Sequence, residues 1–194
     1  MEEIEVKFLN IDKEKIEKKL IAIGAKKVGD FSYRRIVFDF PGFPLDKKAA
    51  WVRLRDEGDK ITLGFKQRLG TTSHDGSTSD TGMREVEFVV SDFEKTALFL
   101  RDIGMIDKFY QENKRTRYMK GNTEFDIDTW PALETYLEIE AKTWEEVDQA
   151  IIELGLNPAD KKIFSTNQIY NSKGIRELDY IKMSFDEMIK RDTK

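Results

Sequence analysis

Like-charged residues separated by a single residue recur along this sequence. In a β-strand, residues two positions apart point to the same side, so each such pair places two like charges next to each other. Paired carboxylates can bind a hard divalent cation such as Mg²⁺ or Mn²⁺, and paired basic residues suit a polyanion such as a triphosphate. The acidic groups are Glu3/Glu5, Glu85/Glu87, Glu124/Asp126/Asp128 and Glu138/Glu140, and the basic pairs are Arg53/Arg55 and Arg115/Arg117.

The acidic and basic groups lie mostly in separate predicted strands. Many strands with alternating charge simply show one face to water, and for each strand alone this remains the alternative explanation. However, Glu and Asp are depleted in strands, and a solvated surface has little reason to sort its charges by strand. An interior that holds both a metal ion and a polyanion requires such sorting. Phosphoryl chemistry depends mainly on positioning and charge stabilisation, so the lack of a Ser or Cys nucleophile motif is no objection.

Hydrophobic periodicity and capping patterns predict the elements that must position these charges. Strands are predicted at 3–9, 33–40, 49–55, 60–68, 84–90, 108–120, 122–128 and 135–141. Helices are predicted from Asp12 to Gly24, from the capping box Ser91/Glu94 to Gly104 and from the capping box Thr143/Glu146 to Gly155, with a third box at Ser184/Glu187 near the end of the chain.

The first two strand–helix patterns are similar to each other. After a shift of 80 residues, Glu5, Val6, Phe8, Asp12, Glu14, Lys15, Leu20, Ile23 and Gly24 match identical residues at Glu85, Val86, Phe88, Asp92, Glu94, Lys95, Leu100, Ile103 and Gly104. The alternative is a chance likeness of two amphipathic segments, since propensity constrains sequence weakly. Two related halves, each a strand, a helix and three strands, close most simply into one eight-stranded barrel.

We therefore predict an α+β, mainly β, fold: a closed eight-stranded antiparallel barrel with flanking helices. The prediction places a single domain over residues 1–194, with the barrel at about 2–142 and a C-terminal helical covering segment at about 143–194.

Composition excludes several classes of protein. The chain has no Cys, which excludes a disulfide scaffold, a thiolate zinc site and a Cys nucleophile. Its net charge of −4 argues against a long nucleic-acid partner. No apolar run approaches the roughly 18 residues of a membrane span, and the acidic start MEEIEVKF is unlike a signal peptide. We expect a cytoplasmic protein and leave its oligomeric state open, a homodimer included.

Taken in order, the charged motifs resemble the CYTH, or triphosphate tunnel metalloenzyme, superfamily. The likeness spans about residues 2–155. The chain departs from the family in the second strand, where many members carry Gln-x-Asp-x-Tyr and this chain has Tyr33, Arg35 and Val37. The motifs are Glu3-Ile4-Glu5-Val6-Lys7, Arg53-Leu54-Arg55, Lys66, Glu85-Val86-Glu87, Lys114-Arg115, Ile127-Asp128 and Glu138-Ile139-Glu140.

The resemblance implies a class IV adenylyl cyclase–thiamine triphosphatase-like enzyme with Mg²⁺ or Mn²⁺ in an eight-stranded tunnel. It implies three sets of site residues. The implied metal ligands are Glu3, Glu5, Glu87, Asp128, Glu138 and Glu140; the phosphate-binding residues are Lys7, Arg53, Arg55, Lys66, Arg115 and Arg117; and the catalytic residues are Lys7, Glu5 and Glu85, with Lys7 as a general base or water-positioning group.

Four functions remain open from the sequence. We place first a phosphohydrolase acting on ATP, thiamine triphosphate or tripolyphosphate, because triphosphate and metal residues are recognisable but a purine pocket is not. The main alternative is a class IV adenylate cyclase that makes cyclic AMP and pyrophosphate from ATP. The others are a non-catalytic triphosphate-binding module and an enzyme acting on the 5′-triphosphate of a short RNA.

Overall fold

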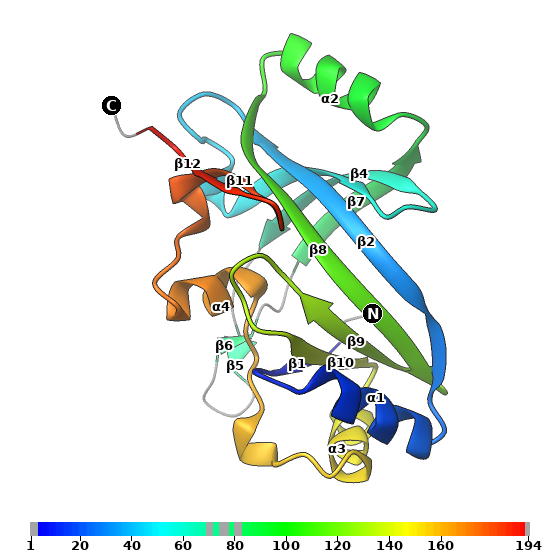
Figure 1. Ribbon diagram of the computed structural model, residues 1–194. Coiled ribbons are helices and arrows are strands. Elements are labelled where there is room, and N and C mark those ends of the chain that lie inside the picture. The colour runs from blue at the N-terminus through cyan, green and yellow to red at the C-terminus, as the bar shows by residue number, and fades with distance from the viewer. Residues whose placement is uncertain (1–3, 69–71, 74–77, 80–82, 193–194) are drawn as a thin grey trace. The chain divides into compact units, whose positions relative to one another are not determined.

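A computed structural model describes residues 4–68, 72–73, 78–79 and 83–192 (Figure 1). The predicted metal ligand Glu3 lies outside these residues. The strands are β1 (Ile4–Phe8), β2 (Lys26–Asp39), β3 (Ala50–Asp56), β4 (Ile61–Arg68), β5 (Thr72–Ser73), β6 (Thr78–Ser79), β7 (Met83–Val90), β8 (Ile106–Lys120), β9 (Thr123–Thr129), β10 (Tyr136–Ala141), β11 (Tyr180–Met183) and β12 (Met188–Lys190). The helices are α1 (Lys13–Ala22), α2 (Phe93–Asp102), α3 (Trp144–Glu153) and α4 (Thr166–Ser172), with short 3₁₀ turns η1 (Asp46–Lys48), η2 (Pro158–Asp160) and η3 (Glu177–Asp179).

The main sheet is antiparallel along the order β1-β10-β9-β8-β2-β3-β4-β7. This confirms the mainly β fold class. Strands β1 and β7 are the two ends of the path, and among the described residues no strand pairing joins them. Closure into a barrel is therefore not shown by the hydrogen bonding. None of the described helices is long and apolar enough to cross a membrane.

The order of elements confirms the predicted repeat. The first half runs β1-α1-β2-β3-β4 and the second runs β7-α2-β8-β9-β10. The chain folds into two compact units that do not coincide with these halves: unit 1 comprises Met1–Phe31 and Lys114–Ser165, and unit 2 comprises Ser32–Asn113 and Thr166–Lys194. Each unit thus combines the first strand and helix of one half with the last two strands of the other half.

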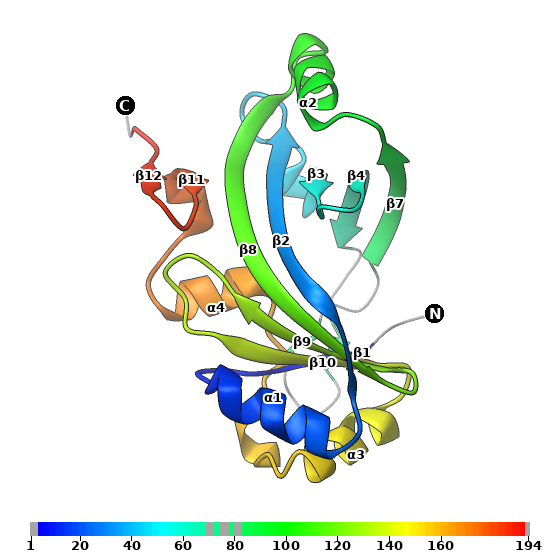
Figure 2. The ribbon, with the colours of Figure 1, turned by 45° about the vertical axis from the view of Figure 1, so that its right-hand side comes forward.

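In unit 1 the apolar face of the sheet packs against two helices. Figures 1 and 2 show α1 and α3 on the same side of β1, β9 and β10. The strands contribute alternate residues such as Val6, Phe125 and Ile139, and α1 contributes Leu20, all nearly inaccessible to water. Because side chains alternate across a strand, this packing directs the charged residues between them to the other face.

Unit 2 follows the same plan with one helix. Residues Ile36 and Phe38 of β2 and Leu54 of β3 form a core with Ala97 and Leu100 of α2. The neighbouring residues on β3, Arg53 and Arg55, consequently point to the face of the sheet opposite α2.

Two capping predictions are confirmed and two need correction. Helix α2 is capped by Asp92, whose side chain accepts from the N–H of Lys95, rather than by Ser91. Asp12 caps α1 in the same way, as predicted, and it corresponds to Asp92 under the 80-residue shift. The capping box at Thr143 is present.

The predicted box at Ser184 is wrong as a helix start. Ser184 and Glu187 instead hydrogen-bond across the turn between β11 and β12. After α3 and α4 the chain thus continues as the hairpin β11–β12, not as a further helix.

The loop after β2 depends on a buried carboxylate, and this dependence can be tested. Asp39 is inaccessible to water and accepts from the N–H groups of Phe40, Leu45 and Asp46 at 2.7, 3.0 and 2.9 Å. We expect Asp39→Ala to lower the free energy of unfolding by about 2–4 kcal/mol, since it leaves three donors unsatisfied. Urea denaturation measures this, and Asp59→Ala, in an exposed turn, is the control. Equal effects would contradict the prediction.

Candidate functional site

Charged side chains form cross-strand rows on one face of unit 1. Antiparallel pairing places Lys7 opposite Glu138, Glu138 opposite Asp126, and Asp126 opposite Arg117. A second row runs from Glu5 through Glu140 to Glu124, and a third contains Tyr136, Asp128 and Arg115. We call these three rows the acidic ladder, because six carboxylates share it with three cations.

Three carboxylates of the acidic ladder could bind a metal ion together. Ligand atoms of Glu5, Glu138 and Glu140 lie within 4.8 Å of one another. Among the described residues, these three are the His, Cys, Asp or Glu side chains that lie close enough together to bind one metal ion. Carboxylate oxygens suit the hard cations Mg²⁺ and Mn²⁺, so the donor set fits the predicted cofactor.

Lys7 lies beside this carboxylate group. It is 2% exposed, its Nζ is 3.1 Å from Glu138 Oε2, and it forms an ion pair with Glu5. A buried ammonium group needs such partners, because desolvation of an unpaired charge costs several kcal/mol or more. The pairing fixes the end of the Lys7 side chain at the carboxylates rather than in solvent.

Two arginines are held by forked ion pairs in the same ladder. Arg115 Nε and Nη2 donate to the two oxygens of Asp128 at 2.7 and 2.6 Å. Arg117 binds Asp126 in the same way at 2.9 and 2.8 Å, and its Nη2 lies 2.6 Å from Glu124 Oε1. Such two-pronged bonds fix the plane of each guanidinium group.

Negative charge is in excess on this face, because six carboxylates share the three rows with three cations. Burial and the neighbouring Asp126 raise the pKa of Glu124 to about 7. Burial also raises the pKa of Asp128, although Arg115 opposes the shift. Burial acts on Glu138 as well, but Lys7 and Arg115 outweigh it and lower the pKa of that carboxyl. An added cation would offset the repulsion among these carboxylates.

Unit 2 carries a second set of rows, which we call the basic ladder. Glu87 pairs across the strands with Gly64, and Gly64 with Arg53; Glu85 pairs with Lys66. Because Gly64 has no side chain, Arg53 Nη2 reaches over it to Glu87 Oε2 at 3.0 Å.

In the other rows of the basic ladder, Lys66 Nζ is 2.7 Å from Glu85 Oε1. Arg55 lies opposite Thr62 on one side and Arg35 on the other.

The cations of the basic ladder are only partly compensated. Burial and the neighbouring Arg55 lower the pKa of Arg53, and burial and the neighbouring Arg53 lower the pKa of Lys66. The Nε groups of Arg53 and Arg55 are buried and have no hydrogen-bond partner among the described residues. Buried donors normally have an acceptor, so an anion is the ligand that this arrangement suits.

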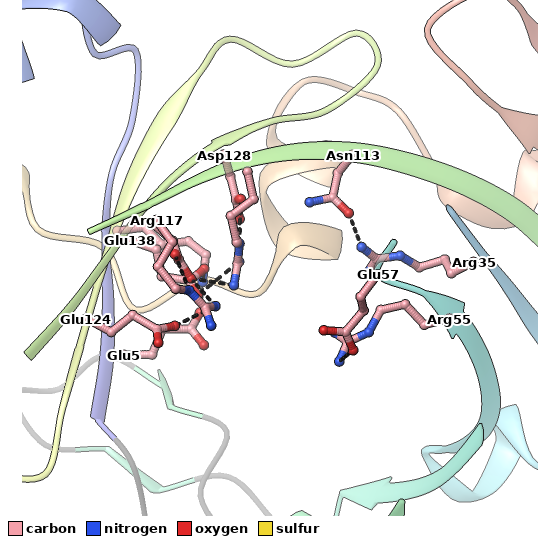
Figure 3. A network of polar contacts seen from close by, with 12 residues as sticks. Glu5, Arg35, Arg55, Glu57, Asn113, Arg117, Glu124, Asp128 and Glu138 are labelled. Atoms are coloured by element: carbon pink, nitrogen blue, oxygen red, sulfur yellow. Dashed lines mark hydrogen bonds and ion pairs between the residues drawn. The ribbon is translucent and has the colours of Figure 1, made fainter. Parts of the chain in front are cut away.

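The structure therefore gathers the predicted residues into two groups. Figure 3 shows members of both, with Glu5, Glu138, Asp128 and Arg117 drawn from unit 1 and Arg55 from unit 2. Glu85 and Glu87, predicted as a catalytic residue and a metal ligand, lie in the basic ladder and pair with cations. The acidic ladder comprises Glu5, Lys7, Arg115, Arg117, Glu124, Asp126, Asp128, Glu138 and Glu140, and the basic ladder comprises Arg35, Arg53, Arg55, Lys66, Glu85 and Glu87.

Three ladder residues were absent from the predicted sets. Glu124 and Asp126 alternate with Asp128 in the sequence, so their position on one face was recognisable. Their ion pairs with Arg117 were not, because these depend on strand register. Arg35 was not predicted as a site residue, because it stands where many family members carry the Gln-x-Asp-x-Tyr motif of the second strand.

Sequence comparison identifies the family. The CYTH domain family matches residues 1–166, and the chain belongs to this family. CYTH proteins include triphosphatases and adenylyl cyclases and are generally metal-dependent. No curated protein matches the chain.

Solved structures share the fold at low sequence identity. PH1012 protein from Pyrococcus horikoshii OT3 is 23% identical, with a TM-score of 0.67, over 87% of this chain and 99% of that one. A Vibrio parahaemolyticus protein proposed to be an adenylate cyclase is 13% identical, with a TM-score of 0.65, over 87% and 97%. A Hippeastrum adenylyl cyclase candidate described as having a dominant triphosphatase activity is 14% identical, with a TM-score of 0.61, over 91% and 98%.

The raised pKa of Glu124 predicts a specific dependence of stability on pH. Between the ordinary Glu pKa and about 7, the folded protein holds a proton on Glu124 that the unfolded chain has lost. The contribution of Glu124 to the free energy of unfolding therefore falls as pH rises through this window. With EDTA present, Glu124→Gln should gain stability relative to wild type between about pH 5 and about pH 8. Urea denaturation at both pH values measures the difference, and a pH-independent difference would contradict the assignment.

Proposed function

We propose that the protein is a divalent-metal-dependent phosphohydrolase acting on a small-molecule or inorganic triphosphate. The observation that carries the proposal is the group of Glu5, Glu138 and Glu140 beside the buried ammonium of Lys7. The partly compensated guanidinium groups of the basic ladder support it, because a triphosphate needs cationic residues as well as a metal ion. We keep a single CYTH-like domain over residues 1–194 as part of this proposal.

The proposed metal ligands are Glu5, Glu138 and Glu140, with Glu3, Glu87 and Asp128 as the further candidates from the sequence. A bound Mg²⁺ or Mn²⁺ would supply positive charge for the phosphate oxygens. Asp128 is already bound on both oxygens by Arg115, so its proposed contribution is to orient that arginine. The same reasoning applies to Asp126 and Arg117.

The proposed phosphate-binding residues are Lys7, Arg53, Arg55, Lys66, Arg115 and Arg117. In hydrolysis, a water oxygen forms a bond to the terminal phosphorus while the bond from that phosphorus to the bridging oxygen breaks. Orthophosphate and a diphosphate are the products. We propose Lys7, Glu5 and Glu85 as catalytic residues, with Lys7 positioning the water or taking its proton.

A class IV adenylate cyclase is the second candidate. Support comes from the Vibrio parahaemolyticus and Hippeastrum proteins, both of which carry a cyclase designation. We place hydrolysis first because metal and phosphate groups are assigned to residues of this chain, whereas cyclisation also needs a purine pocket and an oriented ribose. The two reactions give different products, so one assay separates them.

The products formed from three substrates test the proposal. Purified protein is incubated with Mg²⁺ or Mn²⁺ and ATP, thiamine triphosphate or tripolyphosphate. We expect orthophosphate and the matching diphosphate product, resolved by chromatography, and little turnover in EDTA. Cyclic AMP with pyrophosphate would establish the cyclase instead. No product with any substrate would favour a binding module.

Two substitutions test the carboxylate group directly. We expect Glu5→Gln and Glu140→Gln to abolish detectable turnover and weaken Mn²⁺ binding in calorimetry, because each removes a charged oxygen ligand. The fold should persist, as judged by thermal unfolding. Glu14→Gln, on the exposed side of α1, is the matched control. Near-normal activity in both site variants would rule out this assignment.

The basic ladder is tested by Arg53→Ala. We expect the KM for tripolyphosphate to rise roughly 10- to 100-fold, the effect of losing one charge-assisted contact, with no loss of thermal stability large enough to unfold the protein. Arg101→Ala, on α2 and outside the ladder, should leave KM unchanged. If both variants behave alike, Arg53 does not bind the phosphates.

A further inference from the structure

The internal repeat places identical apolar residues in different surroundings. Under the 80-residue shift, Val6 and Phe8 of β1 correspond to Val86 and Phe88 of β7. The side chains in β1 are 0% and 3% exposed, whereas both side chains in β7 are 55% exposed. The same two residues therefore belong to the core in unit 1 and to the surface in unit 2.

Helix α3 accounts for this difference. Its residues Val147 and Ile151 belong to the core that contains Val6 and Phe8. Strand β10 leads into α3, and its counterpart in the first half, β4, leads into residues 69–82. Positions 70–82 contain no Val, Leu, Ile, Met, Phe, Tyr or Trp. The segment in the place of α3 thus lacks the apolar residues with which α3 covers β1.

The side of α2 that faces away from β2 is also apolar. Glu94 marks the side toward β2, because it pairs with Arg34 of that strand at 3.1 Å. Phe99 and Ile103, one turn apart, lie on the opposite side of the helix and are 61% and 53% exposed. Position 99 corresponds to Lys19 of α1, whose Nζ donates to a backbone carbonyl at the end of α3 at 2.8 Å. This side of α2 therefore faces the place that α3 takes in unit 1.

These residues form one apolar surface of unit 2, which we call the apolar patch. Its members, all between 53% and 61% exposed, are Val86, Phe88, Leu98, Phe99 and Ile103. The strand and helix parts adjoin, because Leu63 pairs with Phe88 across the strands and packs against the core that includes α2.

The area of the apolar patch is close to what a stable dimer needs. Fully exposed side chains of these types present on the order of 100–200 Å² each, so the patch presents roughly 400 Å². A standard interface buries about 800 Å² per partner, of which somewhat more than half is apolar. Monomeric proteins rarely expose contiguous apolar patches larger than this.

Opposite charges accompany the two parts of the apolar patch. Arg84 shares the face of Val86 and Phe88, because residues two apart in a strand point to the same side. Asp102 follows Leu98 by one turn on the outer side of α2. Both charged residues are exposed. A two-fold interface uses the same surface of both copies, so α2 of one copy against β7 of the other brings Asp102 toward Arg84 twice.

We propose that the apolar patch binds a second copy of this chain as a two-fold dimer, in which α2 of each copy lies against β7 of the other. The partner helix covers Val86 and Phe88 as α3 covers Val6 and Phe8 in unit 1. A second copy is a complete partner, since the patch contains both an exposed helix face and an exposed strand face. The dimer does not depend on the proposed function.

Phe99→Lys tests the proposal, because it introduces the residue that α1 carries at the corresponding position. Analytical ultracentrifugation should give wild-type protein a mass of twice the 22.7 kDa of one chain. We expect the variant to raise the dimer dissociation constant by at least about 100-fold, since a two-fold interface loses each buried side chain twice. Its circular dichroism spectrum should match wild type. Ile152→Lys, on α3 and 68% exposed, is the matched control and should remain dimeric.

Disulfide cross-linking tests the arrangement without disrupting the patch. The chain has no Cys, so a bond formed by a single introduced cysteine joins two copies. Mild oxidation of Phe88→Cys mixed with mass-tagged Leu98→Cys should give the mixed dimer, whereas Phe88→Cys mixed with Ile152→Cys should give little. Wild-type protein that stays monomeric well above micromolar concentration would overturn the proposal. A dimer that persists in Phe99→Lys, or equal cross-linking in the two mixtures, would do the same.

Discussion

Antiparallel strand register is the constraint on which the rest of this structure depends. It aligns Lys7, Glu138, Asp126 and Arg117 in one row across four strands. A slip of one residue would turn every charged side chain of a strand toward the helices and every apolar one away from them. The packing of Val6, Ile139 and their neighbours against α1 and α3 prevents such a slip. The hydrophobic core on one face of the sheet therefore fixes the positions of the charged side chains on the other face.

Each ladder retains an electrostatic imbalance that the folded chain does not remove. In the acidic ladder, burial and then repulsion from Asp126 raise the pKa of Glu124 to about 7. In the basic ladder, the same two causes lower the pKa values of Arg53 and Lys66. Uncompensated like charges cost folding free energy. Ligands of opposite charge would offset both imbalances: a divalent cation at the carboxylates and phosphate groups at the guanidinium side chains.

The internal repeat shows how one arrangement of strands can carry two different sets of charged side chains. The two halves keep the same order of a strand, a helix and three strands, and Glu5 corresponds to Glu85. The later strands of the two halves differ in charge: Asp128 has its counterpart in Arg55, which faces Arg35 as Asp128 faces Arg115. Packing constrains only the apolar face, so the charged face of each half was free to change.

Local periodicity let the sequence determine the eight strands of the main sheet path, their apolar and charged faces, the repeat and the presence of separate acidic and basic groups. Side-chain alternation is a property of a few consecutive residues, so it can be read without a structure. Only the tertiary structure decided which charges meet. Glu5, Glu138 and Glu140 come together, and Glu85 and Glu87 pair with Lys66 and Arg53, because register joins strands that are distant in the chain. The capping residue Asp92 and the turn at Ser184 were likewise decided by backbone geometry that the sequence pattern left open.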